Sequence, residues 1–312
     1  EWQNVARSVG RIDFISQGSV ASCTGTLLND LANDQKPYFL TAHHCISTQT
    51  EAQSATVYWN YNTGDSPPAG TPTTNGANLL VTGTSSDFTL LFLTGSVPGG
   101  LFFSGWDSAA FNGSTAGTGI HHPQASHKRI SFGTAHQPNI GNCLPGEQCL
   151  RVDWSSGITE PGSSGSGIWI GSPSDPGGPR LIGTLTGGQS SCGGAPSSMW
   201  DIYGRFSVTY LAIASFLEGT SCVTSVSPTS QNFSNSGGAG SFNVTAAAGC
   251  NWSAVANDSF ITITSGSSGT GNGTVSFSIT GNSGPQRSAS IVVGGQVFTI
   301  NQDPSPGCTP TP

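Results

Sequence analysis

The sequence predicts an all-β protein, and three observations support that prediction. Short runs rich in β-branched and aromatic residues recur along the chain, for example at 22–28, 37–42 and 87–93. Clusters of glycine, proline, asparagine and serine separate these runs, and glycine alone accounts for 44 of the 312 residues, about twice the average share. Helical spacing of apolar residues is plain in one segment only, residues 207–219, where the helix should end on Gly219.

The predicted strands fall into two groups that differ in composition. The first group lies in a segment that holds all six histidines, and its clearest strands are at 22–28, 37–42, 55–61, 87–93, 165–170 and 180–186. The second group lies in a segment rich in serine, threonine, glycine and asparagine, and its strands are expected at 240–246, 260–265, 273–279, 289–295 and 296–302. We therefore expect a domain at 1–219, a β-sandwich module at 220–303 and an extended linker or tail at 304–312.

Charge and composition exclude several classes of function. The formal net charge is −7 with nine lysine and arginine residues in all, so the chain lacks the basic surface that nucleic acid requires. No apolar run approaches the roughly 18 residues of a membrane-spanning helix, and no cysteine pair has the Cys-x-x-Cys spacing of a zinc site. We expect a secreted, extracellular monomer without metal or cofactor, beginning at Glu1 as a processed protein would.

Three segments carry residues suited to nucleophilic catalysis. An apolar strand leads to His43 and His44, Asp87 stands at the head of a second strand, and Ser164 lies in a glycine turn before a third. A serine hydroxyl needs an adjacent base to become a nucleophile, and a buried carboxylate holds an imidazole base in one tautomer. We therefore assign His44 as the base, Asp87 as its orienting partner and Ser164 as the nucleophile.

The glycine turn also offers a place for the negative charge of a tetrahedral intermediate. Consecutive backbone N–H groups can point at one spot there, and we expect those of Gly162 and Ser164 to form an oxyanion hole. Each segment alone is weak evidence, because a Gly-Ser turn in such a chain is usually only a turn. Their order, histidine then aspartate then serine, is that of chymotrypsin-type proteases and strengthens the assignment.

The domain at 1–219 resembles the bacterial lysyl endopeptidase family, a branch of the chymotrypsin-like serine proteases. The stretches that carry this resemblance are 38–45, 57–61, 84–91, 105–107, 120–123, 128–131, 157–166, 187–192 and 201–205. The resemblance implies two six-stranded β-barrels of chymotrypsin type with the catalytic site in the cleft between them. It also selects His44 rather than His43 as the catalytic histidine.

The same resemblance implies a specificity. The counterpart of Asp201 lies in the family's specificity pocket, where a fixed negative charge compensates the desolvation of a cationic side chain. We therefore expect cleavage after lysine, or after lysine and arginine. A structural ion pair between Asp201 and Arg205 is the alternative role for this carboxylate.

Two positions depart from the patterns of related proteases. Thr186 stands where Lys-specific family members carry a histidine. Ser163 stands where trypsin-type zymogens carry an aspartate that captures a newly formed N-terminal amine. We therefore expect that this amine switch does not operate here, and that removal of an inhibitory pro-segment activates the enzyme.

The second module resembles a BACON-type domain. The residues that carry the resemblance are Cys222 and the segments 249–252, 260–263 and 295–302. The resemblance implies a small β-sandwich that binds glycans or another surface ligand. A spacer without a ligand is the alternative, and Trp252 is expected in the core rather than on a binding face.

The eight cysteines suit an oxidising compartment. Three disulfides are expected on grounds of position: Cys23–Cys45, Cys143–Cys149 and Cys222–Cys250. Elimination leaves Cys192–Cys308 as a fourth pair, with a free thiol at Cys192 as the alternative.

These residues together predict a secreted serine endopeptidase that acts on protein or peptide substrates. An inactive protease homologue that serves as a binding or adhesion scaffold is the competing hypothesis. It is disfavoured because His44, Asp87 and Ser164 are all present. A glycosidase lacks support, because no pair of carboxylates stands out in a shared motif.

Overall fold

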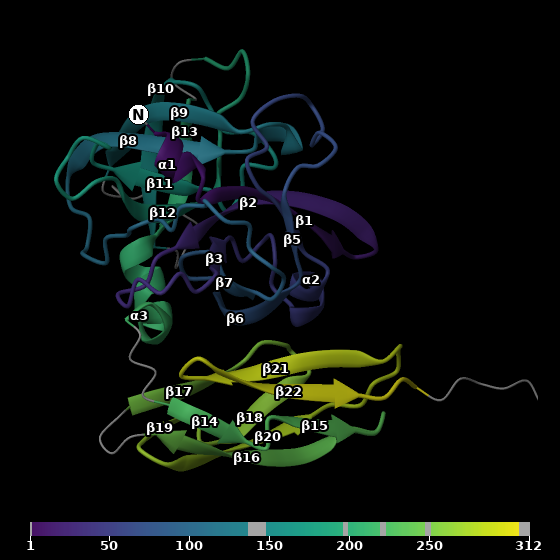
Figure 1. Cartoon of the computed structure of the whole chain (residues 1–312). Helices are drawn as coiled ribbons and strands as arrows, with labels where there is room; N and C mark the ends of the chain where they lie inside the picture. Colours follow the sequence, from purple (N-terminus) through teal and green to yellow (C-terminus); the bar gives the residue numbers. More distant parts are fainter. Residues whose placement is uncertain (1, 137–147, 196–198, 219–222, 247–250, 306–312) are drawn as a thin grey trace, which may run out of the picture.

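The computed structural model describes residues 2–136, 148–195, 199–218, 223–246 and 251–305, and it confirms the all-β prediction (Figure 1). The strands form four sheets. Two of these sheets build the upper body in Figure 1, and the other two build a flatter layer beneath it.

The first sheet contains the strand that leads to His44. Its strands are β1 (Val9–Ser16), β2 (Ser19–Leu28), β3 (Tyr38–Thr41), β4 (Thr56–Tyr58), β5 (Thr73–Asn75), β6 (Ala77–Gly83) and β7 (Phe88–Leu93), in the order β5-β4-β1-β2-β3-β7-β6. Two short helices accompany it, α1 (Gln3–Ala6) and α2 (Gln49–Gln53). The sheet has seven strands where the resemblance implies six, because the three-residue strand β5 adds an edge beside β4.

The second sheet is a closed six-stranded barrel that carries the serine turn. Its strands are β8 (Ser114–His121), β9 (Arg129–His136), β10 (Cys149–Ser156), β11 (Gly167–Ile170), β12 (Arg180–Gly188) and β13 (Trp200–Arg205). A 3-10 turn, η1 (Pro123–Ala125), follows β8. Closure leaves the barrel without a free edge and fixes where its loops emerge.

One helix of twelve residues, α3 (Phe206–Leu217), follows the barrel. It begins one residue before the predicted segment, and the expected stop, Gly219, lies outside the described residues. Ile213 and Phe216 are buried on its inner face. Within the described ranges, no helix has both the length and the apolar character needed to cross a bilayer.

The two upper sheets contact each other through the turn that contains Asp87. Ser86 Oγ lies 2.9 Å from Thr209 Oγ1 of α3. Gly204 of β13 packs so closely on this turn that an added methyl group would lie 1.8 Å from the Ser86 carbonyl oxygen. The barrel strand β13 and the helix that follows it therefore hold this turn of the first sheet.

The lower layer is a pair of packed sheets. One contains β14 (Val223–Ser227), β16 (Gly238–Ala246), β20 (Gly273–Ile279) and β18 (Ile261–Ser265), and the other contains β15 (Ser230–Phe233), β22 (Gln296–Gln302), β21 (Arg287–Val293), β17 (Asn251–Ala256) and β19 (Ser268–Thr270). Trp252 is 7% exposed and belongs to their shared core, as expected. Its indole N–H donates to the Gly271 carbonyl, so the one polar group of the buried ring has a hydrogen-bond partner.

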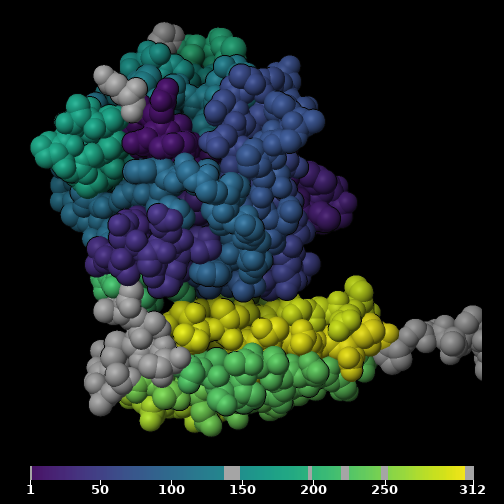
Figure 2. Space-filling model, viewed as in Figure 1, coloured from purple at the N-terminus to yellow at the C-terminus, as the bar shows by residue number. Residues whose placement is uncertain are grey.

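The lower layer packs directly against the first sheet, as the continuous contact in Figure 2 shows. Val292 joins a hydrophobic cluster that contains Leu80 and Phe216, and Val297 packs against it. The buried Asn257 side chain donates a hydrogen bond to the Leu79 carbonyl at 3.0 Å. Apolar burial and a shared hydrogen bond therefore fix the two bodies relative to each other.

The structure contains the Cys23–Cys45 disulfide. Cys149 is disulfide-bonded, whereas Cys143, Cys222, Cys250 and Cys308 lie outside the described residues. Cys192 is a free, exposed thiol, so the Cys192–Cys308 bridge is not formed. Elimination failed here because it assumed that all eight cysteines pair, whereas Cys192 lies in an exposed turn of the barrel.

Candidate active site

His44 stands in a helical turn directly after β3. The Ile46 N–H donates to the Ala42 carbonyl across this turn. His44 Nδ1 lies 2.7 Å from Asp87 Oδ2, and the His44 backbone N–H donates to Asp87 Oδ1 at 3.0 Å. The carboxylate thus holds both the ring and the backbone of His44, which places the ring proton on Nδ1 and leaves Nε2 as the base.

Asp87 is fixed in a backbone conformation that few residues adopt. Its φ is 45°, in the left-handed region, where aspartate is tolerated better than most non-glycine residues. The Asp87 N–H donates to the Thr84 carbonyl and closes the turn. The residue with the strained backbone is therefore the one whose side chain contacts His44. Backbone strain is common at functional sites.

The carboxylate of Asp87 is kept ionised by its neighbours. Burial by itself raises its pKa, but hydrogen bonds from the His44 ring and backbone, the His44 charge and the Thr186 side chain outweigh burial. The net effect lowers the pKa of Asp87 below its usual value. Thr186, which replaces the histidine of Lys-specific relatives, therefore lies beside this carboxylate.

His43 has a separate partner. Its Nδ1 lies 2.7 Å from Thr82 Oγ1 on β6, and the Thr82 oxygen lies 2.6 Å from Thr89 Oγ1. His43 therefore belongs to a polar cluster within the first sheet, and Asp87 is left to His44.

Ser164 is held against the strands that lead to His44. The Thr24 N–H donates to the Ser164 carbonyl at 2.8 Å, and Thr24 follows Cys23, whose disulfide partner Cys45 follows His44. Gly165 has a φ of 82° and abuts the end of β3, where an added methyl group would lie 2.3 Å from Thr41 Oγ1. This contact requires glycine, and it brings the serine turn to the histidine.

The backbone around Ser164 leaves two donors open. Neither the Gly162 N–H nor the Ser164 N–H has an acceptor among the described residues, whereas the N–H groups of Ser163, Gly165 and Ser166 all donate to carbonyls. Free, adjacent donors are what an oxyanion hole requires. Within the described part of the chain no hydrogen bond joins the Ser164 hydroxyl to His44, a bond that commonly tightens only with substrate present.

Asp201 is a buried carboxylate surrounded by neutral donors. It lies on β13 and is 1% exposed. Its Oδ2 accepts hydrogen bonds from Trp154 Nε1 at 2.5 Å, Thr159 Oγ1 at 2.7 Å and Ser190 Oγ at 2.6 Å. Its Oδ1 accepts only one longer bond, from the Ser190 N–H at 3.3 Å. The sequence analysis did not name these partners: Thr159 and Ser190 lie within stretches that carry the family resemblance, but nothing in those stretches indicates a contact with Asp201.

The alternative pairing of Asp201 with Arg205 is absent from the structure. The two residues lie near opposite ends of β13, with Asp201 opposite Gly188 and Arg205 opposite Gly183. Among the described residues no cation forms an ion pair with Asp201. Oδ1 of Asp201 therefore has hydrogen-bonding capacity left for a charged partner.

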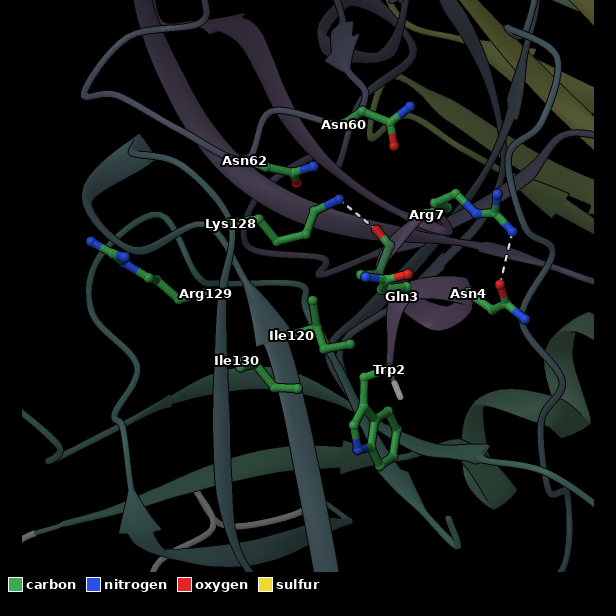
Figure 3. Close-up of a pocket in the computed structure, with 11 residues that line it drawn as sticks. Trp2, Gln3, Asn4, Arg7, Asn60, Asn62, Ile120, Lys128, Arg129 and Ile130 are labelled. Atoms are coloured by element: carbon green, nitrogen blue, oxygen red, sulfur yellow. Dashed lines mark hydrogen bonds between the residues drawn. The ribbon is translucent and has the colours of Figure 1, made fainter. Parts of the chain in front are cut away.

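A separate pocket of about 690 Å³ lies away from these residues, between α1 and the β8–β9 hairpin (Figure 3). Trp2, Asn60 and Ile120 are among the residues that line it. Lys128 points into it and donates a hydrogen bond from Nζ to the Ala6 carbonyl. Burial lowers the pKa of Lys128 to about 7, because an enclosed ammonium group loses hydration.

The two lysines of the chain should therefore differ in reactivity. Burial lowers the pKa of Lys128, whereas the carboxylate of Asp34 raises the pKa of Lys36, so at pH 7.5 a larger share of the Lys128 amines is neutral. Dilute acetic anhydride at this pH should acetylate Lys128 at least about tenfold faster than Lys36, as measured by mass spectrometry of chymotryptic peptides. The Lys128 rate should rise from pH 6 to 8 and then level off. Faster labelling of Lys36, or a Lys128 rate still rising at pH 10, would contradict this.

Comparison with known proteins relates this arrangement to characterised sequences. A family model described as "Lysyl endopeptidase, C-terminal domain" matches residues 1–204. A curated lysyl endopeptidase from Pseudomonas aeruginosa is 35% identical over 225 residues, which cover 69% of this chain and 48% of the relative. The chain thus spans about half the length of that relative.

Solved structures provide a likeness of fold. An HtrA-type protease with a tripeptide has a TM-score of 0.51 and 16% identity, covering 71% of this chain and 64% of that one. The VesB protease of Vibrio cholerae has a TM-score of 0.49 and 14% identity, covering 94% of this chain and 95% of its own.

Proposed function

Because this chain belongs to the lysyl endopeptidase family of serine peptidases, we propose that it hydrolyses peptide bonds on the carboxyl side of lysine. Ser164 attacks the carbonyl carbon, and His44 Nε2 takes the hydroxyl proton and passes it to the leaving amine. Asp87 holds the imidazole and stabilises its charged form. Water then attacks the acyl-enzyme by the same route in reverse.

The intermediate's oxyanion is bound by backbone. In this mechanism the N–H groups of Gly162 and Ser164 donate to the oxygen that becomes negative. Their lack of an acceptor among the described residues supports this role. Fixed donors need no reorganisation during the reaction, which is why such holes contribute strongly to rate.

The observation that carries the lysine specificity is the buried, unpaired carboxylate of Asp201. An ionised group buried without a cation is costly unless a ligand supplies the opposite charge. Gly188 packs against this carboxylate so closely that an added methyl group would lie 2.2 Å from Oδ1, so a side chain at this position would collide with that oxygen. The three donors on Oδ2 hold the carboxylate in place, and Oδ1 receives the substrate ammonium group. A guanidinium also suits a carboxylate, so the proposal covers cleavage after lysine alone or after lysine and arginine.

Digestion of a model protein by the parent and by Asp201→Asn tests this function. The parent should cut after lysine, or after lysine and arginine, as read by mass spectrometry of the products. The asparagine variant should cut after lysine at least roughly 100-fold more slowly, as expected when one partner of a buried charge pair is lost. Asp153→Asn is the matched control, because its half-exposed carboxylate lies on the neighbouring strand β10, and it should leave the specificity unchanged.

Two outcomes would reject the proposed specificity. One is an unchanged lysine preference in Asp201→Asn, and the other is cutting by the parent after acidic or apolar residues. A folded parent without any peptidase activity would instead favour the inactive scaffold.

We also propose that the protein is secreted and that residues 220–303 form a separate module. The disulfide between Cys23 and Cys45 suits an oxidising compartment. Trp252 and Phe260 are 7% and 8% exposed, so neither offers an open aromatic face to a glycan. The contact of Val292 with the upper body favours a docked spacer over a freely presented binding domain.

A further inference from the structure

His121 is a buried histidine that the proposed mechanism does not use. It ends β8 and is 0% exposed. Its Nδ1 lies 2.9 Å from Ser163 Oγ, and its Nε2 lies 3.0 Å from Ser131 Oγ. Ser163 directly precedes Ser164 in the chain, so this imidazole contacts the neighbour of the proposed nucleophile.

The hydrogen bonds around His121 form a chain in which every donor can be assigned. The Ser131 hydroxyl donates to the Ile158 carbonyl at 3.1 Å, so its oxygen accepts from His121 and the ring proton lies on Nε2. Nδ1 is then an acceptor, and the Ser163 hydroxyl donates to it. The Ser163 oxygen in turn accepts the Glu160 N–H at 3.2 Å. One neutral tautomer therefore satisfies all four links.

The surroundings of His121 favour that neutral form. Burial, with a smaller contribution from the charge of Arg129, lowers the pKa of His121 to about 4. The imidazole is therefore uncharged at neutral pH, where the chain of hydrogen bonds is complete.

These hydrogen bonds connect both ends of the segment 158–163 to the side chain of His121. Ile158 and Ser163 bracket the loop before the nucleophile, and the Ser163 N–H also donates to the Glu160 carbonyl at 2.9 Å. The two open donors, Gly162 and Ser164, flank the residue that His121 holds. Oxyanion-hole donors stabilise the transition state only when they point at the developing charge. A displacement of these N–H groups by about 1 Å therefore lowers the rate strongly.

We infer that His121 is a positioning residue for the oxyanion hole and acts through Ser163, an inference that rests on the proposed peptidase function. Trypsin-type proteases hold the same turn with an aspartate and a newly formed N-terminal amine. Here a neutral imidazole holds it from β8, so the brace forms when the barrel folds and requires no new N-terminus.

Asparagine and glutamine at position 121 each preserve one of the two hydrogen bonds that the imidazole makes. The Asn amide oxygen can take the place of Nδ1 and accept from Ser163, whereas the Gln amide nitrogen can take the place of Nε2 and donate to Ser131. We expect His121→Asn to keep kcat within about tenfold of the parent. His121→Gln should lower kcat about 100-fold, the lower end of the loss for one oxyanion-hole donor, with little change in KM.

Two further readouts separate positioning from general destabilisation. Ser163→Ala should match His121→Gln, and the double variant should be no slower than either single one, because both changes break the same link. A peptide aldehyde is attacked by the Ser164 hydroxyl and forms a hemiacetal, whose oxyanion occupies the hole. The affinity for such an aldehyde should fall in parallel with kcat. Melting temperatures measured alongside should not follow this order.

A last pair of measurements does not depend on peptidase activity. Amide hydrogen exchange over 158–165 should be faster in His121→Gln than in His121→Asn, and NMR of the parent should show the Nε2–H tautomer at pH 7. A parent that hydrolyses no peptide would reject the proposed function. The amide exchange rates and the tautomer of His121 would still test its positioning role. Equal kcat and equal exchange in the two variants, or an Nδ1–H tautomer, would overturn that role.

Discussion

Replacing Ser164 by alanine should lower kcat for a lysine peptide by about 10⁶-fold, the loss that follows removal of the nucleophile in serine proteases of this kind. The fold should be unaffected, because the Ser164 side chain makes no hydrogen bond among the described residues and only its carbonyl is tied, to the Thr24 N–H. Kinetics with a fluorogenic peptide and the melting temperature measure the two effects.

A fluorophosphonate probe supplies the control for this variant. The parent should be labelled when folded and lose labelling after heat denaturation, since only the assembled site activates the hydroxyl. Ser163→Ala, which keeps the nucleophile, should remain labelled at a reduced rate. Labelling of Ser164→Ala as strong as that of the parent would show that the nucleophile lies elsewhere.

Asp87→Asn should lower kcat by about 10⁴-fold while leaving the melting temperature close to that of the parent. From His44 the carboxylate accepts two hydrogen bonds, one from the ring and one from the backbone N–H. An asparagine amide has one acceptor oxygen and one donor nitrogen, so it can satisfy only one of them. If the nitrogen faces the ring, Nδ1 becomes the acceptor, the ring proton moves to Nε2 and the base is lost.

The companion change to Asp87→Asn is His43→Ala. His43 contacts Thr82 rather than the carboxylate, so its loss should cost stability more than rate. A drop in kcat for His43→Ala that equals the drop for Asp87→Asn would contradict the assignment of His44, as would normal kcat in Asp87→Asn itself.

The strands could be recognised in the sequence because each leaves a local signal. The proposed catalytic residues leave weak local signals, which gained weight from their order along the chain and from the family resemblance. Asp87 stands at the head of a buried strand, and Ser164 lies in a turn whose glycines have positive φ on both sides, at Gly162 and Gly165. Signals of this kind depend on neighbours within a few residues, which the sequence shows directly.

The partners that hold these residues could not be recognised, because only the fold brings them together. Trp154 and Thr159 are 47 and 42 residues from Asp201 along the chain, and Ser163 is 42 residues from His121. Ser163 could be singled out by its place before Ser164, but nothing near it in the sequence indicates His121 as its partner. The free thiol of Cys192 could be given only as an alternative for a similar reason, since pairing depends on distances that cysteine counts do not contain.

The contacts of Lys36 and Lys128 affect how readily such an enzyme digests itself. Lys36 is ion-paired with Asp34 at 2.7 Å and precedes a proline, and Lys128 is anchored to the Ala6 carbonyl inside its pocket. A protease specific for lysine cuts a bond only when the lysine side chain has left its partners in the folded protein. The lysine and its extended backbone must then enter the active site of a second molecule. For a pocket that accepts lysine alone, we therefore expect self-digestion to pass through unfolded molecules. A concentrated stock should then lose activity at the rate of unfolding rather than in proportion to the square of its concentration.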